Sequence, residues 1–146
     1  MTPDARSVLI DFAGRLGGVV LPDLKTPFVA GSAGLMSATL GMMAEEIDGA
    51  AARLVEENRA IRALFDQALA LTPPAGLAGR LGPLAKTNDE DLRVSALQSS
   101  NNRLRAALID LHAWAETQAA AKPLNKAIWA ELSKSTERRR LSTAPF

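Results

Sequence analysis

The apolar positions of this chain follow a helical period, and the clearest run lies near its middle. Positions spaced alternately four and three residues apart are apolar in ten of eleven cases, where the 47% hydrophobic content would give about five by chance. These positions, called the central seam below, are Met36, Leu40, Met43, Ile47, Ala50, Leu54, Glu57, Ile61, Leu64, Ala68 and Leu71. Their spacing predicts one long central helix over about 31–71.

The start of the chain predicts a shorter helix over residues 3–16. Thr2 can cap it, and Pro3 suits a first helical position, where no backbone N–H is needed. We expect Gly17-Gly18 to end this helix, because glycine accepts the left-handed geometry of a helix terminus.

Two further helices follow a break. Residues 72–88 contain three prolines and three glycines, so we expect a loop there. Thr87 and Glu90 form a capping-box pattern that predicts a second long helix over about 88–121, and Pro123 permits a fresh helix start. The leucines expected to pin the loop to the core are Leu77, Leu81 and Leu84. Since no strand-like alternation occurs, the pattern predicts an all-α four-helix bundle.

A short motif occurs in both long predicted helices. The segment from Asn58 to Arg62 reads NRAIR, and the segment from Asn101 to Arg105 reads NNRLR. Asn101 lies on the apolar seam of its helix, where a polar residue can fix the register between helices. We interpret the echo as two similar antiparallel helices, with an internal duplication as the alternative.

Length and charge favour a single domain over residues 1–146, with 138–146 as a flexible basic tail. The chain has no cysteine, which removes thiol chemistry and disulfides, and we expect a cytoplasmic protein without a secretory signal. The net charge of +1 makes nucleic acid an improbable partner, although the segment 138–140 is Arg-Arg-Arg. Residues 26–44 are uncharged, but they contain few strongly hydrophobic residues, so we expect a buried helix and no transmembrane segment.

Small residues on one side of the central helix are the least expected feature of the sequence. Gly31, Gly34 and Gly41 are candidates for a ligand site or for close helix packing, because glycine inside a helix costs roughly 0.5–1 kcal/mol relative to alanine. The stretch from Gly31 through Ser32 to Gly34, at a helix start, could also offer free backbone N–H groups to an anion. We expect Gly41 to lie against another backbone, either within the chain or in a second subunit.

Glu45 and His112 are the remaining candidates for chemistry. Glu45 belongs to an acidic cluster with Glu46 and Asp48, which could serve acid–base chemistry but more often forms a solvated rim or pairs with arginine. His112 is the single histidine, so a di-metal bundle is excluded, and we interpret it as a partly buried structural residue. We expect no catalytic residue, no metal and no cofactor.

Two family resemblances cover the first part of the chain. A first helix, the segment Val20-Leu-Pro22-Asp-Leu24 and a small-residue helix ending in Ala44-Glu45-Glu46 together resemble little-characterised bacterial helical proteins encoded near acyl-CoA dehydrogenases and aminoglycoside-phosphotransferase-like kinases. The stretch 27–43 is similar to the Gly/Ala-rich helix of cyclodeaminase-type folate enzymes, whose denser glycine run is only partly present. Neither resemblance implies site residues in this chain.

These features predict a non-enzymatic, oligomeric helical binding or accessory protein, with a homodimer as the favoured assembly. The alternative is a small ligand-binding or cyclodeaminase-like enzyme with a pocket beside the glycine-rich start of the central helix.

Overall fold

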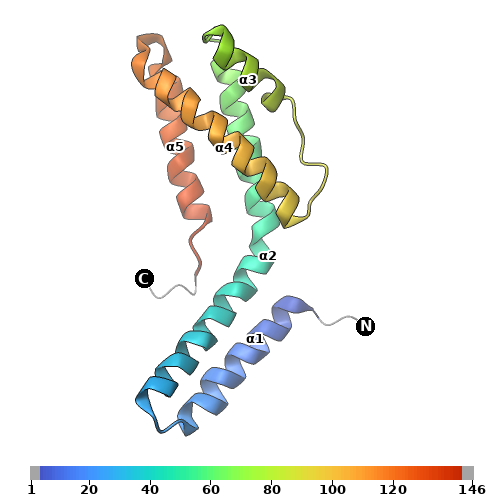
Figure 1. Ribbon diagram of the computed structural model, residues 1–146, viewed down its shortest axis with the longest axis vertical. Helices are drawn as coiled ribbons and strands as arrows, with labels where there is room; N and C mark the ends of the chain where they lie inside the picture. Colours follow the sequence, from blue (N-terminus) through green and yellow to red (C-terminus); the bar gives the residue numbers. More distant parts are fainter. Residues whose placement is uncertain (1–3, 143–146) are drawn as a thin grey trace. The chain divides into compact units, whose positions relative to one another are not determined.

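The computed structural model describes residues 4–142, and all regular secondary structure in that range is helical (Figure 1). The chain divides into two compact units, and the single-domain organisation stays a prediction. We call residues 1–50 with 140–146 the hairpin unit, and residues 51–139 the bundle unit. Helix α2, Pro27–Leu69, contributes its first half to the hairpin unit and its second half to the bundle unit.

The hairpin unit consists of two helices joined by tight helical turns. In chain order these are α1 (Ala5–Arg15), a π-helical turn (Leu16–Val20), a 3-10 turn (Leu21–Asp23) and the first half of α2. Asp4 caps α1 by accepting the backbone N–H of Ser7 at 3.0 Å. The predicted cap Thr2 lies outside the described residues.

Gly17 and Gly18 do not end the first helical segment in left-handed geometry, so that prediction is wrong. No described glycine has a positive φ, and both residues remain in the π-helical turn. Glycine suits position 17 because there is no room for a side chain between this position and α2. A Cβ on Gly17 would lie 2.8 Å from the Oγ of Ser37, which itself donates a hydrogen bond to the carbonyl of Ala13 at 2.8 Å. The close approach of α1 and α2 therefore occurs at this point.

The bundle unit gathers the second half of α2 with α3 (Ala75–Ala85), α4 (Val94–Thr117) and α5 (Lys122–Arg138) around one apolar core (Figure 1). The buried residues of this core are Ile61, Leu64, Phe65, Ala68, Leu81, Leu104, Ala107, Leu108, Leu111, Ala115, Ala121, Leu124 and Ile128. The predicted all-α class is confirmed for the described residues.

Helix α3 replaces most of the loop predicted over 72–88. Leu81 is fully buried, and Leu77 and Leu84 pack against the core, as expected from their spacing. The same spacing of four and three residues gives a short amphipathic helix, and its packing outweighs the low helix propensity of the glycines and of Pro83.

The start of α4 also differs from the capping-box prediction. The N-cap is Arg93, and Thr87 instead donates its hydroxyl to the carbonyl of Leu84 at 2.7 Å and accepts a hydrogen bond from Arg62. Because its hydroxyl serves the end of α3 and a side chain of α2, Thr87 does not initiate a helix.

The first residues of the predicted basic tail belong to the fold. Arg138 ends α5 and forms ion pairs with Glu131 at 2.6 Å and with Glu56 at 3.0 Å. Arg139 pairs with Glu57 at 2.7 Å. Residues 143–146 of the predicted tail lie outside the described residues.

Candidate functional site

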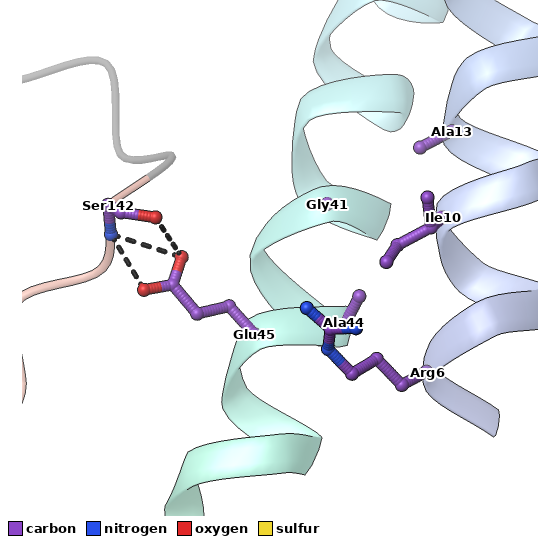
Figure 2. Close-up of a pocket in the computed structure, with 7 residues that line it drawn as sticks. All are labelled: Arg6, Ile10, Ala13, Gly41, Ala44, Glu45 and Ser142. Carbon is purple, nitrogen blue, oxygen red and sulfur yellow. Dashed lines mark hydrogen bonds between the residues drawn. The ribbon is translucent and has the colours of Figure 1, made fainter. Parts of the chain in front are cut away.

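An open groove of about 380 Å³ lies on the hairpin unit between α1 and α2 (Figure 2). It is lined by Arg6, Ile10, Ala13, Gly41, Ala44, Glu45 and Ser142. Two residues singled out in the sequence, Gly41 and Glu45, therefore lie in one groove. Its volume falls in the range of small-molecule sites.

The charged groups of this groove have partners within the hairpin unit. The carboxylate of Glu45 accepts the backbone N–H of Ser142 at 2.8 and 3.0 Å and its hydroxyl at 2.9 Å, as Figure 2 shows. Arg6 lies 3.4 Å from the carboxylate of Asp48, another member of the predicted acidic cluster. The pairing of Asp48 with an arginine of α1 agrees with the interpretation of this cluster as a charged rim.

The small-residue candidates make no close contact with another helix, and Gly31, Ser32 and Gly34 do not line the groove. A Cβ on Gly31 or on Gly41 would meet no atom within 4 Å, and one on Gly34 would only touch Leu21 at 3.9 Å. Ser32 donates its hydroxyl to the carbonyl of Phe28 within its own helix. The close approach of another backbone that was expected at Gly41 thus does not occur within one chain. Gly41 instead lines the open groove.

His112 lies on α4 in the bundle unit and is partly buried, with 17% of its side chain exposed. Its Nε2 atom is 3.0 Å from the Oδ1 of Asn125, and its ring meets the ring of Trp129 edge-on at 5.0 Å. These contacts orient the imidazole between α4 and α5. They fit the interpretation of His112 as a structural residue.

No group of three or more His, Asp or Glu side chains in the range 4–142 is arranged to hold a metal ion, and the chain has no cysteine. The described carboxylates that lie deepest face arginines instead. Their arrangement forms a second candidate feature, a buried charge network in the bundle unit.

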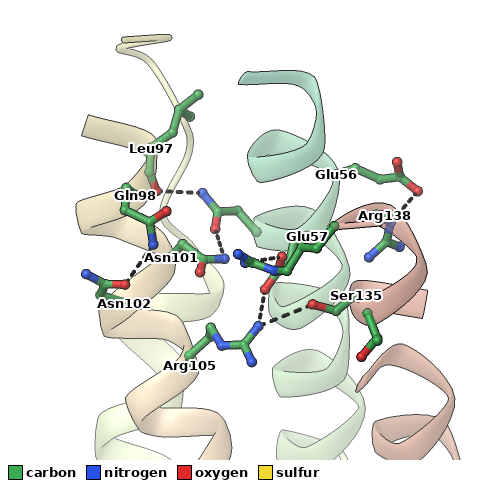
Figure 3. Close-up of polar contacts among 12 residues, drawn as sticks. Glu56, Glu57, Leu97, Gln98, Asn101, Asn102, Arg105, Ser135 and Arg138 are labelled. Carbon is green, nitrogen blue, oxygen red and sulfur yellow. Dashed lines mark hydrogen bonds and ion pairs between the residues drawn. The ribbon is translucent and has the colours of Figure 1, made fainter. Parts of the chain in front are cut away.

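Glu57, the one charged position of the central seam, lies at the centre of this network with 1% of its side chain exposed. Arg105 of α4 and Arg139 pair with its two oxygens, and Arg105 also reaches the hydroxyl of Ser135 at 3.3 Å (Figure 3). Burial acts to raise the pKa of Glu57, but hydrogen bonds from Arg105, Arg139 and Asn101 outweigh it, so the pKa lies below its usual range. Glu57 therefore stays ionised and joins α2, α4 and the end of α5.

The two copies of the sequence echo meet in the same region. Asn101 donates to the Oδ1 of Asn58 at 3.0 Å, and Asn58 donates in turn to Asp89 and to the carbonyl of Leu97. The guanidinium of Arg62 also forms a bidentate ion pair with the carboxylate of Asp89. The Arg62 hydrogen bond is the main reason that the pKa of Asp89 is lowered, and burial opposes it. The buried Asn101 was predicted, whereas its partner Asn58 was signalled only by the echo.

Most of the central seam is covered in the bundle unit, and most of it is uncovered in the hairpin unit. Leu54 and Ile61 are each 1% exposed, whereas Met36 is 60% exposed and Ile47 is 50% exposed. An apolar seam that continues beyond its cover leaves a surface that water solvates poorly.

This uncovered surface is broader than the seam. We call it the α2 face, and it comprises Phe28, Val29, Leu35, Met36, Met43 and Ile47. The only buried apolar residues described in the hairpin unit are Ala33, Ala44 and Ala50. In the described part of the hairpin unit, no large apolar side chain is buried. Six large apolar side chains of α2 are exposed there.

By length and composition, α2 also passes the test for a membrane-crossing helix. An 18-residue window has a mean hydropathy of 1.2, and 11% of it is buried. One such helix is weak evidence, because core helices of other proteins pass the same test.

The chain matches no family model, no curated protein sequence and no solved structure. The two resemblances noted in the sequence therefore stay predictions, and the function must be argued from the geometry alone.

Proposed function

We propose that this chain is a non-enzymatic, oligomeric binding or accessory protein that self-associates through its hairpin unit. The observation that carries the proposal is the α2 face, six large apolar side chains on a unit whose described buried apolar residues are all alanines. Monomeric proteins rarely expose contiguous apolar patches larger than a few hundred Å², and larger patches mark association sites. A dimer is the simplest closed assembly that covers such a face.

The buried charges support a structural role for the bundle unit. A general acid at neutral pH needs a raised pKa, whereas the pKa values of Glu57 and Asp89 are lowered by arginines. Both carboxylates join helices that are distant in sequence. In this proposal the bundle unit is a folded platform and the hairpin unit is its association module, working in the cytoplasm.

Multi-angle light scattering on the purified full-length chain tests this proposal. The expected molar mass at micromolar concentration is about twice the 15.5 kDa of the chain, falling on dilution. A mass of one chain at every concentration up to the millimolar range would contradict self-association.

The groove beside Gly41 favours a second candidate function, the binding of a small ligand. Its volume suits a small molecule, and Arg6 and Glu45 offer groups of both charges. A thermal-shift screen tests it, since a ligand at 100 times its Kd stabilises the protein by about 2.7 kcal/mol. Binding that disappears in Gly41→Leu, which fills the groove, would support this candidate. A screen without hits that depend on Gly41 would count against it.

A further inference from the structure

The α2 face has the size that a stable protein interface needs. Its six apolar side chains are between 45% and 82% exposed, which amounts to on the order of 700 Å² of surface, where a standard interface takes about 800 Å² from each partner. A face of this area on each of two copies meets the requirement of a specific dimer.

The hydroxyl groups that lie among the side chains of the α2 face are already satisfied by their own helix. Ser32 donates its hydroxyl to the carbonyl of Phe28 at 3.0 Å, and Thr39 donates to the carbonyl of Leu35 at 2.8 Å. Because these hydroxyls donate to backbone carbonyls and not to water, the face can be buried against a partner without leaving a hydroxyl donor unsatisfied.

The charges at the two ends of the face are opposite. Lys25 precedes α2, next to the positive end of the helix dipole, whereas Glu46 lies at the far end of the face. A parallel pair of α2 helices would bring the two acidic ends together. An antiparallel pair places each acidic end beside a lysine and a positive helix terminus.

We infer that a second copy of this chain packs on the α2 face, with the two α2 helices antiparallel around a two-fold axis. This inference rests on the proposed self-association, and it specifies the surface through which two copies associate and the relative direction of their α2 helices. Full overlap of the two faces places Phe28 of one copy beside Ile47 of the other. Thr39 then lies near the axis, close to its own symmetry mate.

Charge substitutions on the face provide the first test. Met36→Glu places a carboxylate in the interface and should weaken dimerisation at least tenfold by sedimentation equilibrium. The matched control is Ala38→Glu, which adds the same charge to an exposed position roughly 160° around the same helix. The control should change the dissociation constant less than twofold, and equal effects of the two variants would overturn the inference.

The chain has no cysteine, so single cysteines can be introduced for disulfide crosslinking. This second test does not require that the Met36→Glu variant folds. Under mild oxidation, Thr39→Cys should form a disulfide-linked dimer with itself. Phe28→Cys and Ile47→Cys should each remain uncrosslinked alone and form a mixed dimer when combined. Self-crosslinking of Phe28→Cys would show a parallel pair and would overturn the antiparallel geometry.

The outcomes separate this inference from the proposed function. A wild-type dimer in which none of the three cysteines crosslinks would overturn the α2 face as the interface, while self-association itself would stand. A monomer at all concentrations would overturn both. If a monomeric wild type floated with phosphatidylcholine vesicles and Met36→Glu did not, the face would bind lipid and the inference would be wrong.

Discussion

The buried carboxylate of Glu57 allows a sharp stability prediction. Glu57→Gln keeps the shape of the side chain but leaves Arg105 and Arg139 facing an uncharged amide. Removing one partner of a fully buried ion pair costs about 3–5 kcal/mol. The two guanidiniums are 41% and 40% exposed and can regain water, so we expect a loss of about 2 kcal/mol in the free energy of unfolding. In a unit of this size, that lowers Tm by roughly 8–16 °C.

The neighbouring residue supplies the control. Glu56 carries the same charge and pairs with Arg138, but 62% of its side chain is exposed. Exposed ion pairs contribute about 0–1 kcal/mol, so Glu56→Gln should leave Tm within a few degrees of the wild type. Urea titrations of the wild type and the two variants give the free energies directly.

The pH dependence adds a second signature. Because the pKa of Glu57 is lowered from its ordinary value of 4.5, its ionised form stabilises the fold above that pH. That contribution is lost as the pH falls through the pKa of the folded state. The gap between wild type and Glu57→Gln should therefore be full at pH 7 and should shrink at pH 3. Equal losses in Glu56→Gln and Glu57→Gln, or a gap that is the same at both pH values, would refute the reasoning.

Three further changes have distinct expected outcomes. Gly17→Leu should lower Tm because its side chain meets Ser37, whereas Gly18→Leu, which faces open space, should not; similar melting curves would contradict the packing of α1 on α2. Gly41→Leu should raise the stability of α2 by about 0.5–1 kcal/mol with an unchanged molar mass, and a lower Tm or a lost assembly would reveal a neighbouring chain at the groove. Deleting residues 139–146 should cost about 1 kcal/mol through the lost pairing with the buried network, and an unchanged Tm would restore the view of this segment as a solvated tail.

The helical class and the long central helix could be predicted from the sequence, because a sustained apolar period needs no tertiary information. The predicted range of 31–71 agrees with Pro27–Leu69 within a few residues. Helix α3 could not be recognised by its composition. The stability of α3 comes from the packing of Leu81 in the core. The number of glycines and prolines in the segment gives no information about that packing.

The candidate site was predictable only in part. Gly41 and Glu45 do share a groove, but its other walls come from α1 and from Ser142, which is distant in sequence. No role was predicted for Glu57, which stands out in the sequence only as the one charge of the central seam. Its partners Arg105 and Arg139 lie 48 and 82 residues away, and such pairings are set by the tertiary fold.

Amide hydrogen exchange at two protein concentrations tests most directly whether association stabilises the hairpin unit. At a concentration well above the dissociation constant, amides of residues 27–50 should be protected, and dilution below that constant should speed their exchange at least tenfold. Amides of the bundle unit, such as those around Leu111, should exchange at the same rate in both samples. Exchange in residues 27–50 that does not change with concentration would contradict the account.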